Sequence, residues 1–271
     1  MLDMYSFIID ILIYLFFSVI AEVIHWGYKQ YKLSRAFPEK WREILLDKVA
    51  YYRELSPEDQ KKFEKRIVGF LVDYKLKSVN SPLTDTDKML VASSAIIPVF
   101  AFKNWYYPDL KKIYLFDEDF RMNHPMIPRD ASIKGLVGQG KMKGKMYLSK
   151  KSLYESFSGK TSGKNTGIHE FLHLIDMEDG DADGIPEVIL EKAYIIPWVE
   201  LIKKEIERVC REDSVLSENA CNNEAEFFAE AGTYFFENPE LLAEKHPELF
   251  EMLEKIFGQK RRRKTSLKKI S

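Results

Sequence analysis

The feature that most constrains this chain is a pair of histidines four residues apart, His169 and His173, with Glu170 directly after the first. Residues spaced by four lie on one face of an α-helix, so both imidazoles can meet a single zinc ion. Glu170 then lies beside the metal without binding it, where it can take a proton from activated water and pass it to a leaving amine. The pattern predicts a helix that carries a hydrolytic zinc site.

A catalytic zinc ion needs a third protein ligand and one open position. We expect Glu226 to be this ligand, because residues 223–236 form a helix rich in small and aromatic side chains, where a carboxylate is held on a mostly buried element. Glu230, one turn further on, is the competing residue. Asp179, soon after the histidines, is a weaker alternative.

These segments resemble the bacterial glucose-regulated metallopeptidases represented by Mlc titration factor A, which are similar in catalytic architecture to the anthrax lethal factor protease domain. The similarity extends over about residues 41–257 and is most specific at residues 169–177 and 225–229. It implies a zincin-like fold, with His169, His173 and Glu226 as zinc ligands and Glu170 as general base. It also implies a peptide or protein substrate held against an edge strand.

One position departs from the family pattern. Members often carry a tyrosine seven residues before the ligand glutamate, placed to donate a hydrogen bond to the oxyanion, and this chain has Asn219 there. The asparagine amide can still donate, whereas losing such a donor costs on the order of a hundredfold in rate. Tyr234 is a weaker candidate for the same role.

Two other functions stay open. The family's namesake sequesters a transcriptional repressor, so a membrane-held relative could capture a transcriptional regulator with little or no peptidase activity. A structural zinc protein is less consistent with the pattern, because structural sites close all four positions with cysteine or histidine.

The start of the chain has a different character. Residues 4–24 are almost entirely apolar and approach the length of a membrane-spanning helix, with Asp10 and Glu22 near its two ends. No basic stretch precedes the run, which argues against a cleaved signal peptide. An amphipathic helix packed on the domain is the alternative. Basic residues follow the run, at Lys29, Lys32, Arg35, Lys40 and Arg42.

This distribution of basic residues predicts a single-pass protein of the bacterial inner membrane with its catalytic domain in the cytoplasm. We therefore expect an anchor and juxtamembrane segment at 1–36, a metallopeptidase domain at 37–258 and a basic, disordered tail at 259–271. The tail could contact anionic lipid headgroups. Lysine plus arginine number 41 against 42 acidic residues, so we expect no nucleic acid partner, and we expect a monomer.

The domain is predicted to be α+β, mostly helical with a small sheet. Apolar periodicity predicts two helices within residues 38–76, a third ending near Pro98, and later helices at 186–211, 223–236 and 239–257. Ser56 and Thr84 carry helix-start signals. Short apolar runs predict strands at 113–116, 136–137 and 146–148, with glycines 138, 140 and 144 at a turn.

The remaining features are weaker. Cys210 and Cys221 are too few for a disulfide framework and suggest a reducing compartment, although a single bridge between them stays open. Asp179, Asp181 and Asp183 resemble the start of a calcium loop, but the closing glutamate is not at the expected position. Asp176 either orients a metal ligand or is a helix-end residue.

Overall fold

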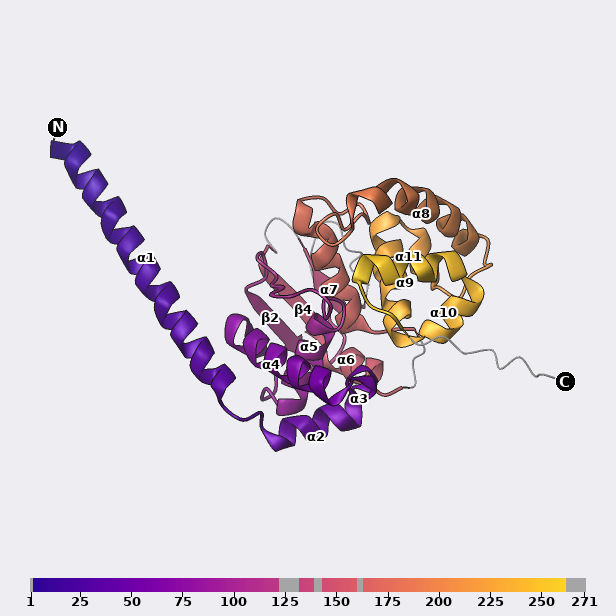
Figure 1. Cartoon of the computed structure of the whole chain (residues 1–271), viewed down its shortest axis with the longest axis horizontal. Helices are drawn as coiled ribbons and strands as arrows, with labels where there is room; N and C mark the ends of the chain where they lie inside the picture. Colours follow the sequence, from indigo (N-terminus) through magenta and orange to yellow (C-terminus); the bar gives the residue numbers. More distant parts are fainter. Residues whose placement is uncertain (1, 122–131, 139–142, 160–162, 262–271) are drawn as a thin grey trace.

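The computed structural model describes residues 2–121, 132–138, 143–159 and 163–261, with side chains described from residue 7 onward. The described residues form a mostly helical domain with one four-stranded sheet, preceded by a long N-terminal helix (Figure 1). This agrees with the predicted α+β class. The α-helices are α1 (Leu2–Ser34), α2 (Glu39–Lys48), α3 (Ala50–Glu54), α4 (Pro57–Asp73), α5 (Asp85–Ile96), α6 (Lys150–Ser156), α7 (Thr166–Asp176), α8 (Ile195–Cys210), α9 (Glu224–Glu237), α10 (Pro239–Lys245) and α11 (Pro247–Phe257). Short 3-10 helices lie at η2 (Met177–Asp179), η3 (Lys192–Tyr194) and η4 (Glu218–Cys221).

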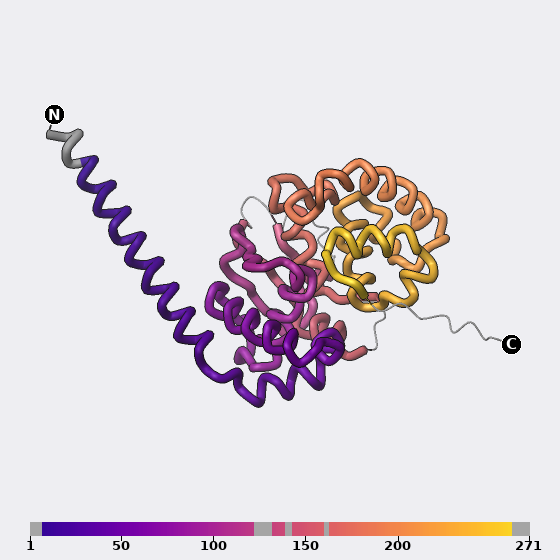
Figure 2. Tube along the Cα trace, in the orientation of Figure 1, coloured from indigo at the N-terminus to yellow at the C-terminus, as the bar shows by residue number. Residues whose placement is uncertain are grey.

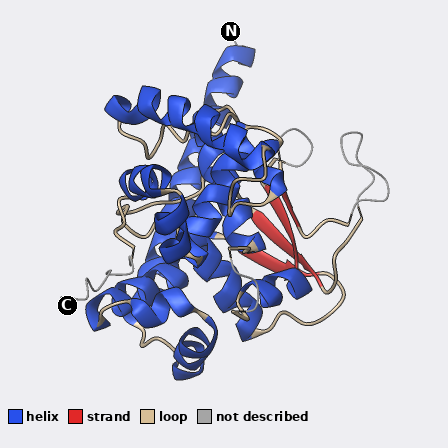
Figure 3. Ribbon diagram, turned by 90° about the vertical axis from the view of Figure 1, so that its right-hand side faces the viewer, coloured by secondary structure: helices blue, strands red, loops and turns tan. Residues whose placement is uncertain are grey.

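The sheet contains β1 (Lys75–Ser78), β2 (Lys112–Phe116), β3 (Gly135–Val137) and β4 (Lys145–Ser149) in the order β1-β2-β4-β3. Strands β1, β2 and β4 are parallel, and β3 lies antiparallel to β4 at one edge. The helices gather on one side of the sheet (Figure 3). Inward-facing side chains such as Ile113, Leu115, Met146 and Leu148 are fully buried against them. The sheet therefore has one packed face, and no helix of the described residues covers the other face.

Local signals start the helices where the sequence predicted. The Ser56 hydroxyl accepts from the Asp59 amide at the start of α4, and Thr84 and Asp87 form a reciprocal capping box at α5. Asn165 caps α7, and Asn223 caps α9 in the same way. Each cap supplies an acceptor for an amide that has no partner within its helix.

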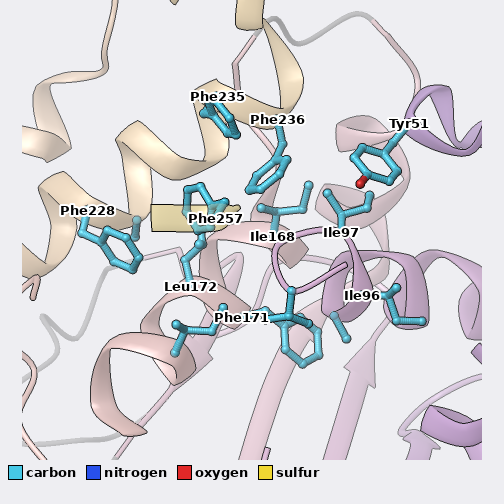
Figure 4. Close-up of a cluster of buried hydrophobic side chains, with 14 of the residues drawn as sticks. Tyr51, Ile96, Ile97, Ile168, Phe171, Leu172, Phe228, Phe235, Phe236 and Phe257 are labelled. Carbon is cyan, nitrogen blue, oxygen red and sulfur yellow. The ribbon is translucent and has the colours of Figure 1, made fainter. Parts of the chain in front are cut away.

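Helix α7 runs through the middle of the domain between α5 and α9. The early helices (indigo and purple) and the late ones (orange and yellow) lie on opposite sides of this pink segment (Figure 2). Figure 4 shows Ile168 and Leu172 of α7 on the side of Phe257 of α11 and Phe228 of α9, whereas Phe171 points the other way, where its ring centroid lies 5.0 Å from that of Tyr107. The five side chains from α7, α9 and α11 are fully buried, so α7 is held on several sides by apolar contacts.

The N-terminal helix differs from every other helix in its exposure. Residues Phe7–Ser34 contain a stretch long and apolar enough to cross a membrane, and none of that stretch is buried by the domain. The alternative of a helix packed along the domain is therefore wrong for the apolar part. The C-terminal part of α1 contacts the domain, where His25 and Lys29 bind the Asp73 carboxylate at the end of α4.

Several element boundaries differ from the prediction. The segment 38–76 holds three helices and then β1, where two helices were expected. Helix α8 begins at Ile195, because residues 186–191 form turns with Leu190 donating to the Pro186 carbonyl. Pro247 divides the expected last helix into α10 and α11, since proline cannot continue a helix but suits the first turn of the next. Gly144 is in the predicted turn with a positive φ of 79°, whereas Gly140 and most of the basic tail lie outside the described residues.

Candidate metal centre

Helix α7 presents two different faces. Ile168, Phe171, Leu172 and Ile175 are fully buried in the core. The residues between them are His169, Glu170 and His173, which the 3.6-residue period turns to the side of α9 and β3. Burial of the apolar face sets the position and rotation of α7, and this also sets the direction in which His169, Glu170 and His173 point.

Three of the predicted residues come together at one point. The Nε2 atoms of His169 and His173 lie 3.1 Å apart, and each lies 3.4 Å from a different carboxylate oxygen of Glu226 on α9. One ligand atom from each residue lies within 4.8 Å of the others. Two imidazole nitrogens and one carboxylate oxygen, all partly exposed, are a donor set that suits zinc and leaves a position open.

The charge of Glu226 is stabilised by the same two histidines. Burial by itself raises the pKa of this carboxyl, but hydrogen bonds and charge from His169 and His173 outweigh it and hold the pKa well below its usual range. The centre is therefore organised around an ionised carboxylate, which is the form that binds a cation.

Glu170 lies beside this group but outside it. Its side chain is only 7% exposed, and burial raises its pKa to about 7. This value is a net effect, because burial and the charge of Glu226 raise the pKa, whereas His173 and a backbone hydrogen bond from Val137 lower it. The carboxylate packs against β3, where Gly135 leaves space for it.

The competing residue, Glu230, lies on the other side of His169. Its Oε1 is 3.9 Å from Nδ1 of His169, the ring nitrogen that faces away from His173 and Glu226. A carboxylate beside that nitrogen helps to orient the imidazole. Glu226 rather than Glu230 therefore groups with the two histidines.

A cavity of about 400 Å³ opens beside these residues. Its lining includes His169 and Glu170 together with Gly135 of β3 and two residues that precede α9, Ser217 and Asn219. Asn219 thus lies at the site, as its place in the family pattern suggested. Sequence analysis missed Gly135 and Ser217, because neither belongs to a recognisable motif and both reach the cavity through the tertiary fold.

The segment between Cys210 and Cys221, which carries Ser217 and Asn219, is fixed by a disulfide and by a side-chain contact. A disulfide joins Cys210, the last residue of α8, to Cys221, the last residue of η4. This is the single bridge that the sequence left open, and it removes the argument for a reducing compartment that the low number of cysteines suggested. Within the segment, the Ser214 hydroxyl contacts Nε2 of the buried His246. Nδ1 of His246 lies 2.6 Å from the Glu205 carboxylate of α8.

The acidic residues after α7 shape a turn. The Asp179 carboxylate accepts from the backbone amides of Asp181 and Glu187, and Asp183 accepts from Ile185. Asp176 accepts from the Gly184 amide, which favours its interpretation as a helix-end residue. Across the described ranges, the only grouping of potential metal ligands is His169, His173 and Glu226, and Asp179 lies outside it.

Comparison with known proteins agrees with this geometry. Residues 24–258 match the family described as glucose-regulated metallo-peptidase M90. Mlc titration factor A of Cronobacter sakazakii is 25% identical over 252 residues, covering 88% of this chain and 92% of that protein. An uncharacterized protein of Synechocystis sp. is 26% identical over 245 residues, covering 86% and 88% of the two chains. Mlc titration factor A of Escherichia fergusonii reaches 35% identity over 130 residues, 45% of this chain and 48% of that one. The chain belongs to the glucose-regulated metallopeptidase family M90.

Proposed function

We propose that this protein is a zinc-dependent peptidase that hydrolyses peptide bonds, with His169, His173 and Glu226 as zinc ligands and Glu170 as general base. The observation that carries the proposal is the convergence of two imidazoles and an ionised carboxylate beside a buried glutamate at the wall of a cavity. A zinc ion bound there would polarise the scissile carbonyl and lower the pKa of the attacking water. The arrangement we infer is zincin-like.

Glu170 has the properties that a proton carrier needs. Its pKa of about 7 lies near neutral pH, where a carboxyl group can both accept and release a proton efficiently. Its carboxylate takes the proton from the attacking water and later delivers it to the leaving amine. The hydrogen bond from Val137 and the close approach of Gly135 keep the carboxylate aimed into the cavity during both transfers.

The edge strand supplies a place for the substrate. Within the described residues β3 pairs only with β4, so the backbone groups of its other side can bind an extended peptide as an additional strand. Gly135 of β3 touches Glu170, so a peptide along this strand would pass the general base. Asn219, across the cavity, could donate its amide to the oxygen that develops negative charge.

Helix α1 is proposed to anchor the protein in the bacterial inner membrane. Its apolar part is long enough to span a bilayer, and none of that stretch is buried by the domain. The lysines and arginines that follow favour a cytoplasmic location for the domain.

A binding function is the second candidate. The names of several relatives describe a factor that titrates Mlc, and this chain has asparagine where a stronger oxyanion donor is frequent. A membrane-held protein that captures a transcriptional regulator would need the cavity and its surroundings but not fast hydrolysis.

The Glu170→Gln variant separates the two functions. We expect it to lose hydrolysis of chromogenic and fluorogenic peptides while its zinc content, measured by mass spectrometry, equals that of the parent. Glu191→Gln, at an exposed position, is the control for loss of a carboxylate. Equal cleavage by Glu170→Gln and the parent would show that the mechanism is wrong, whereas zinc binding without cleavage in either protein would favour capture.

A further inference from the structure

The face of the sheet that turns away from the helices has an unusual composition. Side chains alternate along each strand, so the residues between the buried ones share this outer face. We use the name outer sheet face for six of them. They are Lys75, Lys77, Lys112, Tyr114, Lys145 and Tyr147.

The four lysines lie on neighbouring positions of the outer sheet face. Lys75 is in register with Lys112, and Lys112 is in register with Lys145, so the three form a row across neighbouring strands about 4.8 Å apart. None of the four forms an ion pair with a carboxylate in the described part of the chain, although Lys143 nearby is paired with Asp109. Adjacent like charges destabilise a sheet unless an anion lies against them.

This row lies next to the helix that we propose as the anchor. Lys75 and Lys77 line a cleft of about 550 Å³ together with Tyr28 and Lys32 of α1. Asp73, two residues before Lys75, binds His25 and Lys29 of the same helix. Tyr28 follows the apolar run of α1 by only four residues, so Lys75 and Lys77, which line the same cleft, lie close to the point where the apolar part of that helix ends. The acidic residues at the other ends of the strands, such as Asp117 and Glu118, lie away from it.

We propose that the outer sheet face docks on anionic phospholipid headgroups of the membrane that α1 enters. The inference rests on the proposed anchoring by α1 and adds a second, electrostatic contact that fixes the orientation of the domain. Lysines near an anionic leaflet are attracted by about 1 kcal/mol each, and tyrosine side chains are favoured at the same interfacial depth.

The arrangement of the tyrosines favours lipid over single-stranded nucleic acid. Tyr114 and Tyr147 stack on each other, with ring centroids 5.3 Å apart and an interplanar angle of 15°. Proteins that bind single strands present open aromatic faces on which bases can stack. Here each ring covers one face of the other.

Lysine footprinting of the full chain in nanodiscs tests the proposal. The parent protein is placed in phosphatidylcholine discs and in discs that also contain phosphatidylglycerol, and acylation of each lysine is measured by mass spectrometry. We expect the four outer-face lysines to react about fivefold more slowly in the anionic discs, the factor that corresponds to about 1 kcal/mol per lysine. Lys61 and Lys203, which are exposed elsewhere, should react equally in both.

Charge reversal provides the matched control. Lys75→Glu with Lys112→Glu should abolish the protection of Lys77 and Lys145, whereas Lys61→Glu with Lys203→Glu should leave it intact. Equal reactivity in the two kinds of disc would overturn the proposal, as would protection by an added single-stranded oligonucleotide but not by phosphatidylglycerol. A chain that does not remain with the discs at all would instead refute the anchoring role of α1.

Discussion

Gly135 and Glu170 are in direct contact across the β3–α7 interface: a Cβ added to Gly135 would lie 2.6 Å from Oε1 of Glu170. Such a distance is not tolerated, so Gly135→Ala should push the carboxylate out of position. We expect kcat to fall on the order of a hundredfold, the cost of a small misplacement of a reacting group. Gly69→Ala is the control, because its Cβ would meet Lys29 at an ordinary 3.5 Å. Peptide hydrolysis by both variants measures the effect, and full activity in Gly135→Ala would contradict the role of this contact.

Removing the carboxylate that joins the histidines should release zinc. Glu226→Gln is expected to weaken zinc binding more than about a hundredfold, and Glu230→Gln about tenfold to a hundredfold through the orientation of His169. Glu224→Gln, exposed on the first turn of the same helix, should bind zinc like the parent. Titration against a chelator of known affinity gives the three constants. A larger loss for Glu230→Gln than for Glu226→Gln would reverse the assignment.

Asn219 should affect the rate rather than substrate binding. If its amide donates to the developing oxyanion, Asn219→Ala lowers kcat on the order of a hundredfold with little change in KM. Asn222→Ala, an exposed change in the same segment, is the matched variant. Steady-state kinetics distinguish the two parameters, and a change confined to KM would assign Asn219 to substrate binding instead.

Glu237 should make stability depend on pH. Burial raises its pKa from 4.5 to about 7, against the hydrogen bond from Asn165 and the charge of Arg261. The folded state therefore keeps a proton that the unfolded chain releases, and the free energy of unfolding falls as pH rises from about 4.5 to 7. Glu237→Gln should be more stable than the parent near pH 8, on the order of 1–3 kcal/mol, and similar near pH 4.5. Denaturant unfolding at several pH values tests this, with the exposed Glu244→Gln as control; parallel curves for Glu237→Gln and the parent would show that no such linkage exists.

The disulfide should stabilise the segment that carries Ser217 and Asn219. It closes a loop between residues 11 apart in sequence, and a bridge over a loop of this length contributes about 3 kcal/mol in the chain-entropy description. A reducing agent should lower both the melting temperature and the hydrolysis rate of the parent. The Cys210→Ser, Cys221→Ser double variant should already show both losses and respond no further. An unchanged melting temperature after verified reduction would mean that the rest of the fold holds the segment.

Sequence reasoning succeeded where the information is local. The spacing within α7 and the caps at Thr84 and Asn223 specify helices whatever surrounds them, and the apolar surroundings of Glu226 indicated the carboxylate that meets the histidines. It failed where a partner lies far along the chain. β1 was missed, because its lysine-rich sequence becomes a strand only through pairing with β2.

The contacts of Gly135 and His246 were missed for the same reason. Gly135 meets Glu170 only after α7 has packed under the sheet, and His246 is buried against Glu205, 41 positions earlier. Neither relation leaves a periodic signal in the sequence, since each depends on how separate elements dock.

On α7 the side chains that pack into the core and the side chains of the proposed metal site are different residues on different faces. Folding depends on Ile168, Phe171, Leu172 and Ile175, and a change at His169 or Glu170 touches none of them. A descendant could therefore lose catalysis through one point mutation and retain the whole scaffold. The evolutionary distance between a working hydrolase and an inert receptor of the same shape is correspondingly short.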